Sequence, residues 1–173
     1  NSEGLPFILA GDFNSLPPNT KQTQNFEDSV CEDGDFDADD YLAVLSLWEK
    51  TGMGGLERGD DLPIINETIA KGGKLLVLTD DADLIIGSSW MTQDGRRMFL
   101  HHFAIDPEYQ GRGLSHLLMR ESMSWMEDIG LQIKLEVHRS NEIAKALYCR
   151  YGFQELGDYV VFIIREPKKK DAD

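Results

Sequence analysis

Residues 106–115 carry the strongest chemical signal in this sequence. They read Asp-Pro-Glu-Tyr-Gln-Gly-Arg-Gly-Leu-Ser and lie between an extended apolar run, residues 98–105, and a helix-forming run that starts at Leu114. A glycine-bearing turn that opens a helix presents free backbone N–H groups and the positive end of the helix dipole. Such a helix start binds anions, most often phosphate. Glycine turns of this kind also occur without a ligand, so the spacing alone is compatible with either interpretation.

The pattern around this turn predicts an α/β domain. The spacing of apolar residues predicts helices over residues 37–52, 62–71, 111–129 and 141–151. Apolar or alternating runs predict strands over residues 25–31, 74–79, 84–90, 96–105, 133–138 and 159–165, with turn signals at residues 94–95 and 157–158. A single helix joins the strand 96–105 to the strand 133–138, which predicts a parallel pair. We therefore expect a mixed, mostly antiparallel sheet with helices on both faces.

Composition and charge restrict the class of protein. The chain has 173 residues, 41% of them hydrophobic, which favours one globular domain with a sizeable core. A net charge of −14 argues against nucleic acid as the main partner. The apolar runs are too short to span a bilayer, and we recognise no secretory signal. The spacing of Cys31 and Cys149 is typical neither of a metal site nor of a disulfide framework. We expect a cytoplasmic protein with one domain over residues 24–166, a tail or an extra strand over 1–23, and a disordered tail over 167–173.

Two acidic motifs indicate other functions only weakly. The tetrapeptide Gly-Asp-Phe-Asn at residues 11–14 follows a short apolar run, as in metal-dependent phosphoesterases, but the later Ser-Asp-His motif of those enzymes is absent. Residues 33–44 begin like a calcium loop, yet Ala38 and Val44 stand where that loop needs glycine and glutamate. We therefore predict no metal site.

Two blocks of the sequence together resemble the GNAT family of N-acetyltransferases. Residues 110–115 resemble the family's Q/R-x-x-G-x-G/A loop, with Ser115 where the family usually has glycine or alanine. Residues 137–153 resemble the family's second signature, V-x-x-x-N-x-x-A-x-x-L-Y-x-x-x-G-F, in which Asn141 and Tyr148 are the polar positions. The resemblance covers about residues 25–165. It implies the acyl-CoA N-acyltransferase fold, whose sheet is splayed at a central parallel strand pair.

The resemblance implies acetyl-CoA as the cosubstrate and assigns residues to it. Backbone N–H groups of the loop would hold the pyrophosphate at the helix start. The main chain at the end of the preceding strand would bind the pantetheine arm as an added strand. Asn141 would contact the same arm and would also serve as a helix N-cap. The residues expected to bind acetyl-CoA are Phe103, Ala104, Ile105, Gln110, Gly111, Arg112, Gly113, Leu114, Ser115 and Asn141.

The resemblance also implies direct transfer, in which an amine attacks the thioester, a tetrahedral intermediate forms and a thiolate leaves. Tyr148 would protonate the thiolate, since a phenol with an ordinary pKa of about 10 can act as the acid. The alternative is a tyrosine that packs in the core. A backbone N–H near residues 103–105 would stabilise the oxyanion.

The base that takes the proton of the amine is predicted to be His101. It shares strand parity with Phe103 and Ile105, and histidine titrates near neutral pH. Alternation would place His102 on the opposite face of the sheet as a structural residue. Glu67 or a water chain could replace His101 as the base.

The acceptor is predicted only as a class, namely a primary amine of a small molecule, a peptide N-terminus or a lysine. The acidic residues Glu57, Asp60, Asp61 and Glu67 could attract a cationic amine, or they could form a solvated face. The alternative function is a non-catalytic CoA-binding or regulatory domain of the same fold. Neither nucleic acid nor a membrane is expected as a partner, and a homodimer stays open because dimers are common in the family.

Overall fold

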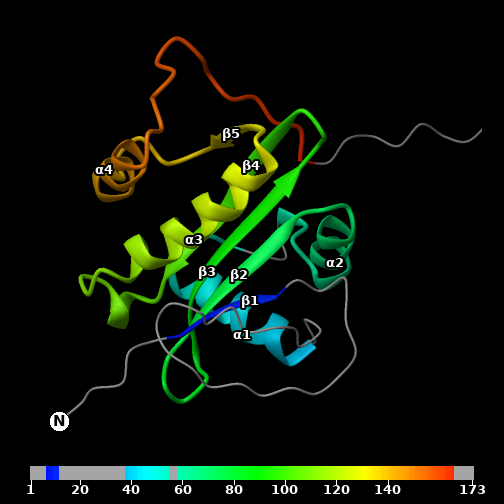
Figure 1. Cartoon of the computed structure of the whole chain (residues 1–173), viewed down its shortest axis with the longest axis vertical. Helices are drawn as coiled ribbons and strands as arrows, with labels where there is room; N and C mark the ends of the chain where they lie inside the picture. The colour runs from blue at the N-terminus through cyan, green and yellow to red at the C-terminus, as the bar shows by residue number, and fades with distance from the viewer. Residues whose placement is uncertain (1–6, 12–37, 55–57, 166–173) are drawn as a thin grey trace, which may run out of the picture. The chain divides into compact units, whose positions relative to one another are not determined.

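The computed structural model describes residues 7–11, 38–54 and 58–165. The chain divides into two compact units, Asn1–Glu136 and Val137–Asp173. The described part of the first unit holds one sheet and three α-helices, and that of the second unit holds one α-helix (Figure 1). The predicted anion-binding turn and the predicted acid Tyr148 therefore belong to different units.

Helices α1 (Ala38–Lys50) and α2 (Leu62–Ala70) form where the apolar spacing predicts them. Asp39 and Asp40 lie in the first turn of α1, where a negative charge complements the helix dipole. Asp61 is the N-cap of α2, and its Oδ1 accepts a hydrogen bond from the Ile64 N–H at 2.9 Å. Both helices thus begin at residues that stabilise a helix start.

Within the described residues, five strands form one sheet in the order β1-β2-β3-β4-β5 (Figure 1). They are β1 (Phe7–Gly11), β2 (Lys74–Thr79), β3 (Ile85–Gln93), β4 (Arg97–Ile105) and β5 (Gln132–Leu135). The first four are antiparallel to their neighbours, and β5 is parallel to β4, as the single crossover helix predicts. The parallel pairing ends at Leu100 and Leu135, whereas β4 continues to Ile105. No described strand therefore pairs with the second half of β4 on the side of β5, as expected for a splayed sheet.

A β-bulge interrupts β4 at His102. The pairing of Ser88 with Ala104 is followed by that of Trp90 with His101, so β4 has one more residue than β3 in this interval. His102 has φ +38°, near the left-handed region that non-glycine residues rarely adopt. The bulge therefore ends the strict alternation of side chains along this strand.

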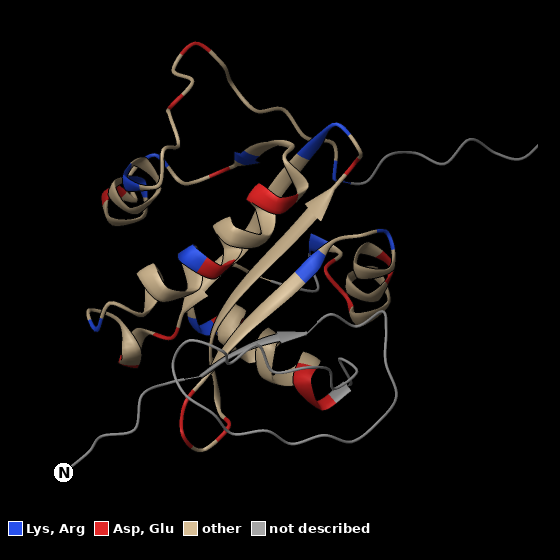
Figure 2. Cartoon of the chain, viewed as in Figure 1, with Lys and Arg blue, Asp and Glu red and all other residues tan. Residues whose placement is uncertain are grey.

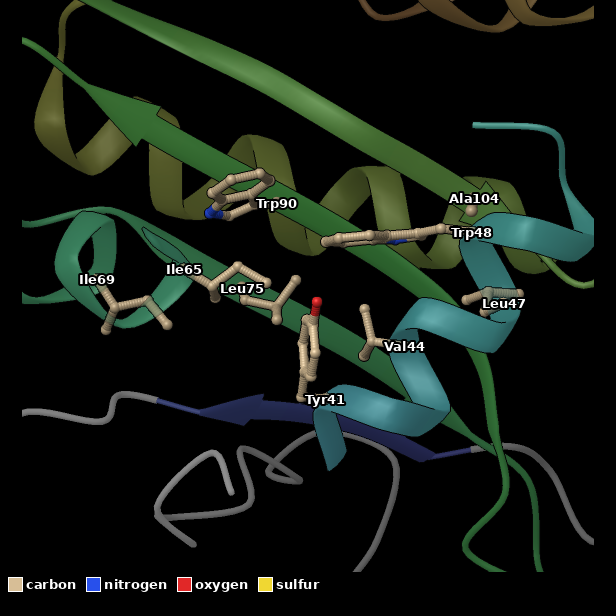
Figure 3. Close-up of a cluster of buried hydrophobic side chains, with 9 residues drawn as sticks. All are labelled: Tyr41, Val44, Leu47, Trp48, Ile65, Ile69, Leu75, Trp90 and Ala104. Carbon is tan, nitrogen blue, oxygen red and sulfur yellow. The ribbon is translucent and has the colours of Figure 1, made fainter. Parts of the chain in front are cut away.

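Helix α3 (Leu114–Ile129) covers the face of the sheet opposite to α1 and α2. Successive strand residues point to opposite faces. Ser88 accepts a hydrogen bond from Trp48 of α1 at 2.8 Å, while the next residue, Ser89, contacts Ser122 of α3 at 2.7 Å. The core on the α1/α2 face gathers around Trp48 and Trp90, whose ring centroids are 5.9 Å apart (Figure 3). Its buried members are Tyr41, Val44, Leu47, Trp48, Ile65, Ile69, Leu75, Trp90 and Ala104.

The second unit contains α4 (Glu142–Arg150). Asn141 is its N-cap, with Oδ1 accepting from the Ala144 N–H at 3.1 Å, so the predicted capping role is confirmed. The prediction of a strand over residues 159–165 is wrong, because these residues form no strand and their side chains are exposed. A strand needs hydrogen bonds from a neighbouring strand, and apolar character in the local sequence does not supply that neighbour.

The remaining helix and strand predictions within the described residues are confirmed to within three residues at each end. Residues 7–11 lie in the stretch predicted to be a tail or an extra strand, and they form β1. Four predicted features lie outside the described residues: the strand 25–31, residues 12–14 of the Gly-Asp-Phe-Asn tetrapeptide, the start of the calcium-loop-like stretch and the tail 167–173. The domain limits 24 and 166 stay a prediction.

Candidate active site

The turn between β4 and α3 contains two glycines with left-handed backbone. Gly111 has φ +75° and Gly113 has φ +81°. Apart from chain neighbours, no described atom lies within 4 Å of the position that a Cβ would take at either glycine. Gly113 is the N-cap of α3, and no side chain caps this helix. The first turn of α3 thus has no side-chain cap and follows two glycines with open space beside them, which suits the binding of an anion.

A buried carboxylate fixes the segment that leads into this turn. Asp106 Oδ1 accepts from the Glu108 N–H at 3.0 Å, and Oδ2 forms an ion pair with the Lys50 ammonium of α1 at 3.0 Å. Burial alone would raise the pKa of Asp106, but the Glu108 N–H and Lys50 hold the pKa below its ordinary value. The carboxylate is therefore ionised at neutral pH and ties the turn to α1.

Further contacts tie the same segment to the sheet. The Tyr109 hydroxyl donates to Asp80 Oδ2 at 2.7 Å, and Asp80 lies in the β2–β3 turn. Gln110 Nε2 donates to the Ile105 carbonyl at 2.9 Å, while the Arg112 guanidinium lies 4.9 Å from the centre of the Tyr109 ring. No local pattern predicts the Tyr109–Asp80 pair, because its partners are 29 positions apart. These contacts hold the turn in place before any ligand binds.

The second half of β4 forms the other part of the candidate site. Its pairing with β3 continues to Ile105, but its pairing with β5 ends at Leu100. Phe103 is half-buried, and Ala104 and Ile105 are buried. Along β3 and β4 the only Lys, Arg, Asp or Glu is Arg97 (Figure 2). An uncharged strand that loses its neighbour partway suits an extended ligand that binds through backbone-like amide groups.

His101 lies on the α1/α2 face of β4. Its Nε2 is 2.9 Å from Thr92 Oγ1, and its ring centroid is 5.5 Å from that of Trp90 and 6.0 Å from that of Phe99. Burial, with a smaller contribution from His102, lowers the pKa of His101 below its ordinary value of 6.5. The neutral imidazole, which is the form that accepts a proton, therefore predominates at neutral pH.

His102 lies on the same face as His101, so the expectation that alternation separates them is wrong. Its ring centroid is 4.1 Å from that of Trp48 and 5.6 Å from that of Trp90. The bulge is the physical reason, because an inserted residue shifts the side chains that follow it. His102 Nε2 approaches Asp60 Oδ2 to 3.2 Å without hydrogen-bond geometry, and neither ring nitrogen has a hydrogen-bond partner among the described residues. His102 is thus a nearly buried ring held by packing, with the Asp60 carboxylate beside it.

The acidic residues near α2 take part in local structure. Asp61 caps α2, Asp60 lies against His102, and Glu67 forms an ion pair with Lys71. The hydrogen bond from Lys71 lowers the pKa of Glu67, which makes Glu67 a poorer base than His101 at neutral pH. Glu57 lies outside the described residues.

Tyr148 is the predicted acid and lies on α4 of the second unit. Burial raises its pKa to about 12, so the phenol keeps its proton at neutral pH. Its ring meets the Phe153 ring edge-on at a centroid distance of 5.8 Å. The acid role of Tyr148 and the contact of Asn141 with a cofactor stay predictions.

Nowhere in residues 7–11, 38–54 and 58–165 do three His, Cys, Asp or Glu side chains gather so that they could hold a metal ion. No helix in this part of the chain is long and apolar enough to cross a membrane.

Solved structures resemble the fold. The ribosomal-protein-S18-alanine N-acetyltransferase from Escherichia coli matches with a TM-score of 0.58 at 22% identity, over 69% of this chain and 74% of that chain. A GNAT-family acetyltransferase from Staphylococcus aureus Mu50 matches with a TM-score of 0.61 at 15% identity, over 72% of this chain and 84% of that chain. Both likenesses identify the fold.

Sequence relatives and a family model identify the family. N-alpha-acetyltransferase RimI of Mycobacterium tuberculosis is 41% identical over 58 residues, which are 34% of this chain and 35% of that protein. Mycothiol acetyltransferase of Clavibacter sepedonicus is 27% identical over 122 residues, 69% of this chain and 40% of that protein. The chain thus spans well under half the length of these relatives. The family model of the GNAT acetyltransferase domain matches residues 63–162, more than half of the chain. The chain belongs to the GNAT acetyltransferase family.

Proposed function

We propose that this domain transfers an acetyl group from acetyl-CoA to a primary amine. The observation that carries the proposal is the start of α3, where Gly111 and Gly113 leave open space in front of an uncapped helix. A pyrophosphate is an anion that such a helix start would bind. Residues 110–115 would hold it, and the main chain of residues 103–105 would bind the pantetheine arm where β4 extends past β5. Membership of the GNAT family supports the same assignment.

The reaction would be a direct transfer. Acetyl-CoA would supply an activated acyl group, the amine nitrogen would bond to the acetyl carbon, and the bond from that carbon to sulfur would break. His101, which is neutral at neutral pH, would take the proton of the amine. Tyr148, whose pKa is about 12, would donate its proton to the leaving thiolate. A backbone N–H near Phe103 would stabilise the negative oxygen of the tetrahedral intermediate.

The acceptor is proposed as a peptide N-terminus, a lysine or a small amine. The names of the relatives support a broad choice, since one is an N-alpha-acetyltransferase and another is a mycothiol acetyltransferase. The matches cover only 35% and 40% of these two proteins, so their names do not fix the acceptor of this chain. The panel of acceptors therefore includes both peptides and small molecules.

Two measurements test the proposal. Saturating acetyl-CoA should raise the melting temperature, and no stabilisation would refute the proposed cofactor. Incubation with acetyl-CoA and a panel of amines should release the CoA thiol and yield an acetylated product that mass spectrometry detects. Stabilisation by acetyl-CoA without transfer to any amine would favour the alternative, a CoA-binding or regulatory domain.

A further inference from the structure

Three neighbours hold the ring of His101 on the α1/α2 face of the sheet. Trp90 of β3 lies directly opposite His101, and the next residue on the same face of β3 is Thr92. Thr92 Oγ1 is 2.9 Å from His101 Nε2. The centroids of the Trp90 and Phe99 rings lie 5.5 and 6.0 Å from that of the imidazole. One hydrogen bond and two aromatic contacts therefore fix the position of the imidazole.

The two ring nitrogens of His101 have different surroundings. Nε2 meets the Thr92 hydroxyl, whereas Nδ1 has no hydrogen-bond partner among the described residues. A threonine hydroxyl can accept or donate, so it suits either tautomer of the neutral imidazole. In the imidazolium both nitrogens carry hydrogen, and Thr92 Oγ1 can then only accept from the Nε2–H. A proton can therefore arrive without rearrangement of this bond only at Nδ1.

Burial makes the acceptor at Nε2 important. Burial of the imidazole lowers its pKa, because the charged form is poorly solvated there. A buried N–H without an acceptor adds to this cost, most of all where the donor is charged. The Thr92 hydroxyl supplies the acceptor, so it stabilises the imidazolium relative to the neutral ring.

Charged groups on neighbouring elements act on the same ring. After burial, the largest influence on the pKa of the imidazole is the charge of His102, which lowers it further, whereas Asp60 and Glu136 raise it. Lys134 of β5 forms an ion pair with Glu136 at 3.1 Å. A substitution of Thr92 by an uncharged residue leaves all these charges in place. A change in the titration of the imidazole then reports the hydrogen bond itself.

We propose that Thr92 is a positioning residue for acetyl transfer. Its hydroxyl accepts the Nε2–H of His101 and leaves Nδ1 to take the proton of the acceptor amine. The electron pair of the broken N–H bond stays on the amine nitrogen, which attacks the acetyl carbon, and the imidazolium then passes the proton to water. The inference rests on the proposed function, in which His101 is the base. Thr92 acts through His101.

The chain offers a conservative variant and a matched control. Thr92→Val keeps the branched shape that suits a strand and replaces the hydroxyl by a methyl group. Thr92→Ser keeps the hydroxyl. Thr68 of α2 bonds to the other ring of this cluster in the same manner, because its Oγ1 accepts from Trp90 Nε1 at 3.1 Å. Thr68→Val thus removes a threonine hydroxyl from the same aromatic cluster without breaking the bond to His101.

Nuclear magnetic resonance of protein that contains isotope-labelled histidine measures the tautomer and the pKa of His101 without any acetyl transfer. The chain has four histidines, and His101→Gln identifies the signals of this one. At neutral pH the wild type should carry its ring hydrogen on Nε2. Thr92→Val should lower the pKa of His101, because the imidazolium loses its acceptor. Thr92→Ser and Thr68→Val should keep the pKa of the wild type.

The pH dependence of kcat/KM, measured with the best amine of the panel, tests the same bond in catalysis. In Thr92→Val the acidic limb of the profile should move to lower pH. The rate on the plateau should fall by about tenfold to 10²-fold, which is part of the roughly 10²–10⁴-fold that a positioned base supplies. Thr92→Ser should restore the profile of the wild type, and Thr68→Val should leave the acidic limb unmoved.

Specific outcomes overturn the proposal. A wild-type His101 that carries its hydrogen on Nδ1, or equal pKa values and pH profiles in Thr92→Val and Thr68→Val, overturns the role of Thr92 and leaves the proposed function intact. Full activity of His101→Gln overturns the role of both residues in proton transfer, while acetyl transfer itself stands. A wild type that acetylates no amine overturns the proposed function and the role of Thr92 together. If Thr92→Val does not fold, Thr92→Ala removes the same hydroxyl, and the same comparisons decide.

Discussion

Replacing Gly113 by alanine should separate ligand binding from fold stability. Gly113 has φ +81°, and apart from chain neighbours no described atom lies within 4 Å of its added Cβ. The new methyl group therefore meets a ligand at the helix start without meeting a described part of the protein. Gly95, in the β3–β4 turn, has φ +78° and an equally open Cβ position, so Gly95→Ala is the matched control.

The magnitudes follow from the backbone conformation and from binding. Alanine in the left-handed region costs about 1–2 kcal/mol, which at ~2–4 °C per kcal/mol lowers the melting temperature of either variant by about 2–8 °C. Acetyl-CoA at about 100 times its Kd stabilises a protein by about 2.7 kcal/mol. A methyl group that weakens binding at least tenfold removes about 1.4 kcal/mol of this gain or more. The ligand-induced rise in melting temperature should thus fall to about half or less in Gly113→Ala and stay complete in Gly95→Ala.

The assay is a thermal melt of three proteins, each with and without acetyl-CoA at one fixed concentration. The melting temperatures without ligand measure the backbone cost, and the differences with ligand measure binding. If Gly113→Ala retains the same ligand-induced rise as Gly95→Ala, the start of α3 is not the phosphate site. If both variants lose the ligand-induced rise in melting temperature, the defect is general, and the argument from the open Cβ position of Gly113 is contradicted.

Three further predictions test other parts of the molecule. Tyr148→Phe should lower kcat by about 10²–10⁴-fold and leave acetyl-CoA affinity unchanged, and an unchanged kcat would contradict the acid role. Because the pKa of Tyr148 is about 12, its ionisation should cause no loss of the wild-type rate up to about pH 11. The pKa of His101 is lowered in the folded protein, so the unfolded chain binds more protons than the folded one just below pH 6.5, and stability falls as the pH drops there. Between about pH 7.5 and 5 the melting temperature should therefore fall less steeply in His101→Gln than in the wild type. Equal slopes of melting temperature against pH would contradict this prediction. Gly87→Ala should destabilise the fold by about 1–3 kcal/mol in denaturant titrations, because its Cβ would lie 2.9 Å from Ile105 Cδ1 and 3.1 Å from Leu78 Cβ, and a wild-type midpoint would refute the close packing.

The helices and most strands were predictable because their signals are local. The limits of β2 are those that the apolar run 74–79 predicts, and α1 lies within the predicted range 37–52. The turn at residues 110–115 was also predictable, since its glycines take the left-handed backbone that only glycine adopts readily. A local signal sufficed wherever the residues that determine the conformation are neighbours in sequence.

The bulge and the last strand prediction show where local signals fail. Nothing in the residue types near His102 marks an extra residue in the strand, and a histidine at φ +38° is stabilised by contacts from α1 and β3. The parity rule consequently assigned His101 and His102 to different faces. Residues 159–165 have the composition of a strand, but a strand also requires a partner that composition does not specify.

The net charge of −14 is a poor guide to the acceptor, because the nearby acids have other partners. Asp61 caps α2, Glu67 pairs with Lys71, and Asp60 lies against a nearly buried histidine. None of these three carboxylates is in place solely to receive a cationic amine. What remains is the long-range field of the whole chain, which raises the encounter rate with any cation and is screened within about 8 Å at physiological ionic strength. An acceptor preference that reflects direct contacts should therefore persist when salt is raised, whereas a preference for cationic amines that disappears with salt would reflect net charge alone.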